Sequence, residues 1–216
     1  MILEKVLEFG ISKKYFEELA IKDIDKSCCT LDNFIIDFDK TKEKVCNEAN
    51  QVTRKSCDGL CLVESIDFIE FKSLNNFFDK EFKYKLKSNK ENLEESEIIK
   101  EKVSKFNFNK KIRDSIWILD YIINHDELKL NNSYLEKIYN DIDKNYFIVK
   151  DNYQSLINLN LQFQALSGLK NNSLNNRKKM DILITSTLEE ISLSINKPKL
   201  IDCNELKSYL ESKGKK

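Results

Sequence analysis

Two acidic side chains and one basic side chain stand out in the stretch KSCDGLCLVESIDFIEFKSL, which covers residues 55–74. Asp58 precedes the apolar run GLCLV, whereas Glu70 and Lys72 lie inside the next apolar run. Carboxylate oxygens are ligands that hard divalent cations such as Mg²⁺ and Mn²⁺ prefer, and a neighbouring ammonium group can stabilise charge on a phosphoryl oxygen. The residue types therefore predict metal-assisted hydrolysis of a phosphate ester.

The register of the two runs decides whether these side chains meet. Residues i and i+2 of a strand point to the same face, so Glu70 and Lys72 share one face. A three-residue connection that pairs Val63 with Asp67 would place Asp58 across from Lys72 and diagonal to Glu70. A two-residue turn would invert every side chain of one strand and separate Asp58 from the pair. The sequence leaves the turn open.

Asp58 before an apolar strand, followed by the tripeptide Glu70-Phe71-Lys72 inside the next strand, resembles the motif of the PD-(D/E)xK nucleases. The resemblance implies the restriction-endonuclease-like fold and a Mg²⁺ or Mn²⁺ cofactor. It implies that Asp58 and Glu70 hold the metal, together with the backbone carbonyl of Phe71. It also implies that Lys72 orients or activates water, and that Glu48 on the preceding helix assists metal or water binding.

The resemblance covers residues 33–151. The segments KKIRDSIWILDYII and NYFIVKD resemble the helix and the fourth core strand of the family, whereas Cys57 stands where the family motif has proline. The same residues have plainer interpretations that stay open. Glu70 and Lys72 would look similar on an edge strand with one polar face, Asp58 with its glycine could form a turn, and Glu48 could be an exposed helical glutamate.

Charge gives a local rather than a global indication of a nucleic-acid partner. The chain has 36 Lys and Arg against 36 Asp and Glu, so its net charge favours no polyanion. Residues 72–113, however, hold 12 basic against 7 acidic side chains. Phosphate contacts come mainly from such side chains, and we expect Lys110, Lys111 and Arg113 to bind nucleic acid, DNA being favoured over RNA. The lysine- and asparagine-rich composition is typical of an AT-rich microbe and suggests a defence, toxin or mobile-element context by analogy.

Two other functions compete with a Mg²⁺-dependent endonuclease. The first is a non-catalytic interaction or inhibitor protein with an acidic edge strand, and the sequence leaves open a homodimer or a protein partner. The second comes from FIIDFDKT, residues 34–41, which resembles the first motif of haloacid dehalogenase-type phosphatases. That resemblance implies Asp37 as nucleophile and Asp39 as acid/base. A strand that runs into a helix capped by Asp39 explains the same residues.

The elements that must position these residues give an α/β (α+β) order with a small mixed central sheet flanked by helices. We expect one nuclease-like domain over 1–216, with its core at 33–151, an N-terminal helix and a C-terminal helical extension. Only 4 Gly and 1 Pro argue against a turn-rich β-barrel. The predicted strands are 33–38, 57–63, 65–74 and 145–151. The predicted helices are 2–20, as one helix or two short ones broken near Gly10, followed by 39–52, 95–106, 110–128 and 180–195. Residues 154–169 fit a strand by alternation and a helix by length, and we favour a helix from about 159. We expect a loop after Lys72 and a frayed tail.

Cellular context follows from apolar runs and cysteines. No apolar run approaches 18 residues and the N-terminal segment is charged throughout, so we expect a cytoplasmic protein without a membrane partner. Six cysteines form no CxxC pair, and the single histidine, His125, leaves no zinc ligand set. We expect reduced, mostly buried thiols.

Overall fold

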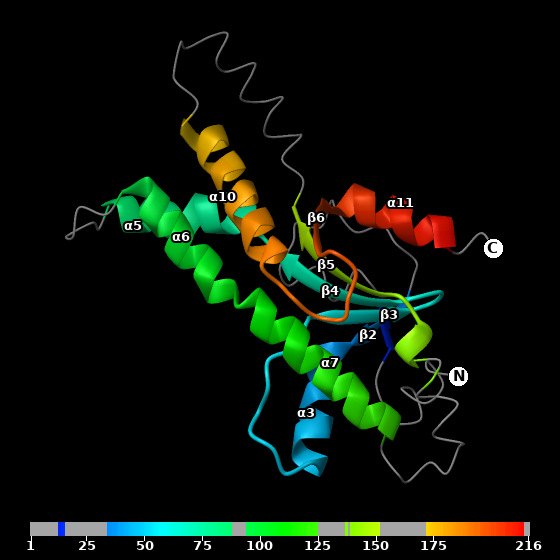
Figure 1. Cartoon of the computed structure of the whole chain (residues 1–216). Helices are drawn as coiled ribbons and strands as arrows, with labels where there is room; N and C mark the ends of the chain where they lie inside the picture. Colours follow the sequence, from blue (N-terminus) through cyan, green and yellow to red (C-terminus); the bar gives the residue numbers. More distant parts are fainter. Residues whose placement is uncertain are drawn as a thin grey trace.

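A six-stranded mixed sheet forms the centre of the molecule (Figure 1). The computed structural model describes residues 13–15, 34–87, 94–124, 137, 139–151 and 172–213. The strand order is β1-β2-β3-β4-β5-β6, antiparallel from β1 to β4 and parallel from β4 to β6. The strands are β1 Lys13–Tyr15, β2 Phe34–Asp37, β3 Gly59–Leu62, β4 Ile66–Lys72, β5 Lys144–Lys150 and β6 Lys199–Asp202. The predicted mixed sheet with flanking helices is confirmed.

Helices cover both faces of this sheet. They are α3 Phe38–Glu48, α4 Leu74–Asn76, the π-helix η2 Phe77–Phe82, α5 Lys83–Lys87, α6 Glu95–Phe106, α7 Phe108–Asn124, α10 Asn172–Glu189 and α11 Cys203–Lys213. The larger core lies between one face of the sheet and helices α3, α6, α7 and α10, whereas α11 packs on the other face (Figure 1). The sheet is therefore buried on both faces.

Strand β4 lies in the interior of the sheet, between β3 and β5. Ile66 and Phe68 face the larger core, and Ile69 and Phe71 face the core under α11, as the two-residue period of a strand requires. Because β4 is paired on both sides, the interpretation of this segment as an edge strand is wrong.

The β3–β4 hairpin has a three-residue connection, one of the two possibilities that the sequence left open. Leu62 pairs with Ile66 across a three-residue connection, and Gly59 pairs with Ile69. One step beyond Gly59, Asp58 therefore lies opposite Glu70. The three-residue connection that would pair Val63 with Asp67 would have placed it opposite Lys72, two residues further along β4, and the structure does not have this pairing. Because the shift is two residues, the side chains keep their faces and Asp58 stays on the side of Glu70.

Several other elements differ from the sequence-based expectations. Residues 13–15 form β1 where a helix over 2–20 was predicted, and residues 73–87 are largely helical where we expected a loop. The last long helix ends at Glu189 rather than at 195, and the tail contains β6 and α11. Short strands such as β1 and β6 exist through pairing with a distant neighbour, which local patterns do not reveal. The helix predicted from about 159 lies outside the described residues.

The described cysteines are of two kinds. Cys46, Cys57 and Cys61 are buried free thiols, as predicted, but Cys203 is disulfide-bonded, so the prediction of reduced thiols is wrong at that position. Among the helices that the structure describes, none has the length and apolar character needed to span a bilayer.

Candidate active site

Asp58 is held where three elements meet, just before β3. Its backbone carbonyl accepts a hydrogen bond of 3.1 Å from the N–H of Phe38, the first residue of α3. Its Oδ2 accepts a hydrogen bond of 2.7 Å from the backbone N–H of Phe71 in β4. The N–H and C=O of one strand residue point toward the same neighbouring strand, so the Phe71 carbonyl also faces the Asp58 side of β4.

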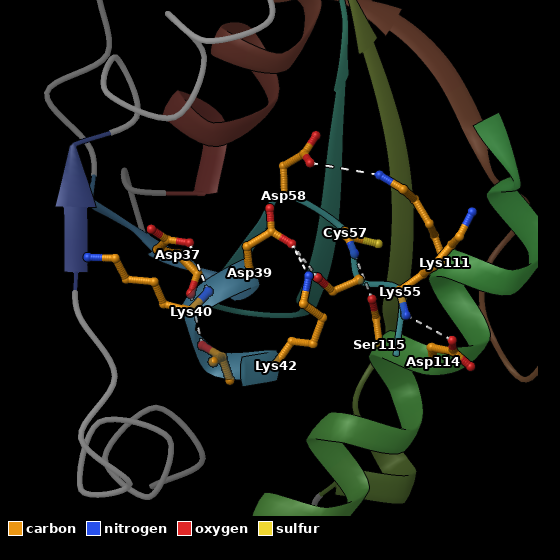
Figure 2. A network of polar contacts seen from close by, with 12 residues as sticks. Asp37, Asp39, Lys40, Lys42, Lys55, Cys57, Asp58, Lys111, Asp114 and Ser115 are labelled. Atoms are coloured by element: carbon orange, nitrogen blue, oxygen red, sulfur yellow. Dashed lines mark hydrogen bonds and ion pairs between the residues drawn. The ribbon is translucent and has the colours of Figure 1, made fainter. Parts of the chain in front are cut away.

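Glu70 is the centre of a four-residue ionic cluster. Its side chain is fully buried, and its Oε1 contacts the ammonium groups of Lys72 and Lys111, the latter at 2.5 Å. The Lys111 Nζ lies 3.9 Å from Asp58 Oδ1, and Figure 2 shows this side chain reaching from α7 toward Asp58. Lys72 also donates a hydrogen bond of 2.8 Å to the carbonyl of Phe71. We call Asp58, Glu70, Lys72 and Lys111 the ionic cluster.

Burial shifts the proton affinities within the ionic cluster. Desolvation and the negative charge of Glu70 raise the pKa of Asp58 to about 7, although Lys72 and Lys111 act in the opposite direction. For Lys111, burial alone would lower the pKa, but the charges of Glu70 and Asp58 raise it above its ordinary value. Lys111 therefore stays an ammonium ion at physiological pH, while Asp58 exchanges its proton near neutrality.

Helix α7 is fastened to the segment before Asp58, one turn away from Lys111. The Asp114 carboxylate accepts a hydrogen bond of 3.1 Å from the N–H of Lys55, and the Ser115 hydroxyl accepts one of 2.9 Å from the N–H of Cys57 (Figure 2). Both side chains are buried. These two hydrogen bonds fix the position of Asp58 relative to α7, and hence relative to Lys111.

Cys57 occupies the position of proline in the PD-(D/E)xK motif that this segment resembles, and its thiol is unreactive. Its side chain is fully buried, and burial together with the charge of Glu70 raises the pKa of its thiol. A buried thiol held in the protonated form is a poor nucleophile. The contribution of Cys57 is its backbone N–H, which donates the hydrogen bond to the Ser115 hydroxyl.

The donors at the ionic cluster suit a hard cation. Two carboxylates and the Phe71 carbonyl offer only oxygen, which is the donor type that Mg²⁺ and Mn²⁺ prefer. The second oxygen of Glu70, Oε2, is buried and accepts no hydrogen bond in the described part of the chain. An unused carboxylate oxygen in a buried position is costly unless a cation or a donor reaches it. The residues therefore fit a divalent metal.

The number of protein ligands is small. In the described ranges, no group of three or more His, Cys, Asp or Glu side chains gathers as a metal site. Mg²⁺ commonly keeps several water molecules and binds one or two carboxylates plus substrate phosphate oxygens. The ionic cluster can thus supply part of a coordination sphere that water and substrate complete.

The structure does not bring Glu48 to this group. Glu48 is the last residue of α3, and α3 starts beside Asp58, so Glu48 lies about 15 Å along the helix axis from the cluster. Its exposed carboxylate lies 3.9 Å from Lys44, one turn earlier on α3. The predicted contribution of Glu48 fails because α3 begins at the cluster and runs away from it.

Asp39, in the first turn of the same helix, is the α3 carboxylate nearest the cluster (Figure 2). It accepts hydrogen bonds of 2.7 Å from Lys42 and 2.8 Å from Ser56. Burial alone would raise the pKa of Asp39, but these two hydrogen bonds and the charge of Lys42 hold it below its ordinary value. Asp39 thus stays ionised and fastens α3 to the segment that leads to Asp58.

The three predicted nucleic-acid contacts on α7 point in different directions. Lys110 and Arg113 are exposed, as a phosphate-binding role requires, whereas Lys111 turns inward to the carboxylates. Its assignment as a surface contact is therefore corrected: Lys111 belongs to the ionic cluster. Sequence reasoning had no local signal for this, because the contact joins residues 41 positions apart.

A small cavity of about 220 Å³ opens beside Lys72. It is bounded by β4, η2 and α6, and its lining includes Lys72, Ser73, Asn76, Lys102 and Phe106. The Lys72 Nζ lies 5.5 Å from the centroid of the Phe106 ring. The cavity leads from the solvent to the ammonium group that lies against Glu70.

A larger cavity of about 650 Å³ lies at the opposite end of β5, next to Lys144. Strand β5 is parallel to β4 and Lys144 pairs with Ile66, so this cavity lies roughly 13 Å from Glu70 and roughly 20 Å from Lys72 along the strands. Asp120, Tyr139 and Asn196 are among its lining residues. No residue of the ionic cluster lines this larger cavity, whereas Lys72 lines the smaller one. The smaller cavity is therefore the one through which a substrate could reach the cluster.

The other face of β4 carries a second buried carboxylate, Asp67, whose role is structural. Its Oδ1 accepts hydrogen bonds from Ser65 at 2.6 Å, Asn145 at 2.7 Å and Tyr209 at 3.0 Å. Its Oδ2 lies 3.3 Å from the ammonium group of Lys213. Tyr209 and Lys213 both belong to α11, so Asp67 anchors that helix. Unlike Glu70, Asp67 has no oxygen left for a ligand.

Asp37 and Asp39, the two residues of the phosphatase interpretation, make structural hydrogen bonds at the start of α3. Asp37 is the N-cap of α3, and its Oδ1 accepts a hydrogen bond of 3.2 Å from the N–H of Lys40. We expected Asp39 as the cap, and this expectation is wrong. Strand β2 pairs antiparallel with both β1 and β3, whereas the phosphatase motif requires the end of a central parallel strand.

Comparison with known proteins adds no assignment: no family model, no curated protein and no solved structure matches this chain.

Proposed function

We propose that this protein is a metal-dependent nuclease that hydrolyses phosphodiester bonds, with Mg²⁺ or Mn²⁺ as its cofactor. One observation carries the proposal: Asp58, the residue before β3, accepts a hydrogen bond from the Phe71 N–H next to Glu70, and the Lys72 ammonium lies against Glu70 and the Phe71 carbonyl. The four groups of the D…ExK resemblance therefore lie together on one buried hairpin. A fully buried Glu70 with a spare oxygen is expensive for stability and is the kind of feature that functional sites retain.

Each residue has a distinct role in this proposal. Asp58 and Glu70 would hold the cation together with the Phe71 carbonyl. A bound Mg²⁺ or Mn²⁺ supplies activation of a water molecule and stabilisation of negative charge on the phosphoryl oxygens. Lys72 would orient the attacking water or neutralise charge that develops on the phosphate, because its ammonium is held at the rim of the small cavity.

The surroundings suit a polyanionic substrate. The small cavity beside Lys72 is also lined by Lys102, whose ammonium is paired with Glu81 of the same cavity. The exposed Lys110 and Arg113 lie near Lys111 on α7 and can bind phosphate groups of a nucleic-acid backbone. DNA as the preferred substrate, cytoplasmic localisation and a defence, toxin or mobile-element context are parts of the proposal that rest on the sequence.

A non-catalytic interaction protein is the alternative. Its original basis, an exposed acidic edge strand, is gone, since β4 is interior and Glu70 is fully buried. What favours it is the charge balance of the ionic cluster, in which two ammonium groups already neutralise two carboxylates. Such a cluster would also exist in a nuclease fold that has lost turnover.

Cleavage assays separate the two functions. Purified protein is incubated with plasmid DNA and with RNA in Mg²⁺, Mn²⁺ or EDTA, beside the variants Glu70→Gln and Lys72→Met. We expect cleavage with metal only, reduced at least about a hundredfold in both variants. Lys199→Gln is the matched control, because Lys199 is an exposed lysine at the start of β6 that belongs neither to the cluster nor to the proposed nucleic-acid contacts. Inert wild-type protein on every nucleic acid, or equal cleavage by wild type and Glu70→Gln, would exclude the proposed site.

A further inference from the structure

Lys111 occupies the position between the two carboxylates that a divalent cation would need. Its ammonium lies 2.5 Å from Glu70 Oε1 and 3.9 Å from Asp58 Oδ1. Two carboxylates held this close repel each other unless a cation lies between them or one is protonated. In the metal-free protein, Lys111 is one of the two ammonium groups that meet this requirement, and the only one that contacts both carboxylates among the described residues.

The attachment of Lys111 differs from that of Lys72. Lys72 is carried by β4 itself, and its ammonium is also tied to the Phe71 carbonyl of the same strand. Lys111 projects from α7 to the hairpin, where, of the groups that the structure describes, its ammonium contacts only the two side-chain carboxylates of the ionic cluster. Its side chain is 20% exposed, against 15% for Lys72. A lysine has a flexible four-carbon stem, and its ammonium can swing while the helix stays in place. The Asp114 and Ser115 hydrogen bonds keep α7 itself fixed.

The net charge of the ionic cluster opposes the addition of a divalent ion while both lysines stay in place. With Asp58 and Glu70 ionised and Lys72 and Lys111 protonated, the ionic cluster is neutral. A divalent ion added to it would leave two net positive charges in a largely buried position, close to an ammonium group that repels it. Departure of one ammonium into solvent halves this excess, and of the two ammonium groups only that of Lys72 is also held by a backbone carbonyl of the described chain.

We infer that Lys111 is a resident cation that holds the carboxylate pair in the absence of metal and is displaced into solvent when a divalent ion binds. This inference rests on the proposed function, since it requires that Asp58 and Glu70 bind a metal. It makes Lys111 a positioning residue: it preserves the geometry of the empty site and sets the metal concentration needed to fill it.

Calorimetric titration with Mn²⁺ tests the competition directly, without reference to turnover. Removal of the competing charge should tighten Mn²⁺ binding, so we expect at least a tenfold lower Kd for Lys111→Gln than for wild type. Lys110→Gln, which removes the neighbouring exposed lysine, serves as the control for the general loss of one positive charge and should change Kd less than threefold. Lys111→Arg keeps the competing charge and should not tighten binding.

The outcomes separate this inference from the proposed function. Mn²⁺ binding by wild type with the same or weaker affinity in Lys111→Gln overturns the competition and leaves the metal site standing. Absence of binding in every protein overturns both. Should Lys111→Gln fail to fold, the wild type still decides the matter: the NMR signal of the Lys111 ammonium group in ¹⁵N-lysine-labelled protein should lose its protection on titration with Mg²⁺. A signal that stays protected at saturating Mg²⁺ contradicts displacement.

Discussion

Replacement of Asp58 by asparagine should stabilise the metal-free protein at neutral pH, even though it removes a proposed metal ligand. Asparagine has the shape of aspartate, and its side-chain oxygen can still accept the hydrogen bond from the Phe71 N–H. What the substitution removes is a carboxylate that is only 15% exposed and lies next to the buried charge of Glu70.

The magnitude follows from the pKa of Asp58, which burial and Glu70 raise from 3.8 to about 7. Below pH 4 this carboxyl is protonated in the folded and unfolded chains alike. Between pH 4 and pH 7 it ionises in the unfolded chain but not in the folded one, so folding loses about 1.4 kcal/mol per pH unit. The wild type therefore loses on the order of 4 kcal/mol of unfolding free energy from this group between pH 4 and pH 8. Asp58→Asn cannot lose it.

Urea unfolding in EDTA, followed by the fluorescence of the single tryptophan, Trp117, measures this difference. The free energy of unfolding of Asp58→Asn minus that of wild type should rise with pH and level off above pH 7. Asp39→Asn is a control of opposite sign: the pKa of Asp39 is lowered from 3.8, so that variant should lose stability relative to wild type as pH rises toward 3.8, and the difference should stay constant from pH 4 to pH 8. A difference for Asp58→Asn that stays flat from pH 4 to pH 8 would refute the reasoning.

Three further results are expected. Asp67→Ala should destabilise the protein by about 3–5 kcal/mol in chemical denaturation, because it leaves the Lys213 ammonium without its buried partner, yet Mn²⁺ affinity should stay as in wild type. Ser115→Ala should cost about 1–2 kcal/mol and also weaken Mn²⁺ binding, because the Cys57 N–H loses its acceptor and Asp58 is held less firmly. The Mn²⁺ affinity of the wild type should rise about tenfold from pH 6 to pH 8, because Asp58 must give up a proton whose pKa is about 7; a pH-independent affinity would show that Asp58 is no ligand.

The hairpin could be predicted from the sequence because its signals are local. The alternation in IDFIEFK defines the faces of β4, but the sequence left the length of the connection open, and the three-residue connection that places Asp58 on the face of Glu70 is known only from the structure. Helix α6 was predicted with its observed bounds, and in the structure a capping box between Glu94 and Glu97 begins it. The partner of Asp58 differs by two residues from the one considered, because the sequence cannot choose between three-residue connections that start at neighbouring positions.

The rest of the site depends on packing between distant segments. Helix α3 begins beside Asp58 and extends away from it, so Glu48 at its last residue lies far from the cluster. The residues of that helix do not indicate which way it extends from the sheet. The rotation of α7 about its axis turns Lys111 inward and leaves Lys110 exposed, because Ile112, Ile118 and Leu119 are buried in the larger core. The adjacent residues Lys110 and Lys111 therefore have different roles, which a count of charges along the sequence cannot distinguish.

The central claim is that Asp58 and Glu70 share a divalent cation, and crystals soaked in Mn²⁺ test it most directly. The account predicts a manganese anomalous peak within bonding distance of one carboxylate oxygen of Asp58 and one of Glu70, beside the Phe71 carbonyl, with the Lys111 ammonium moved away. No peak at this position under saturating Mn²⁺, with Lys111 still bridging the two carboxylates, would contradict it.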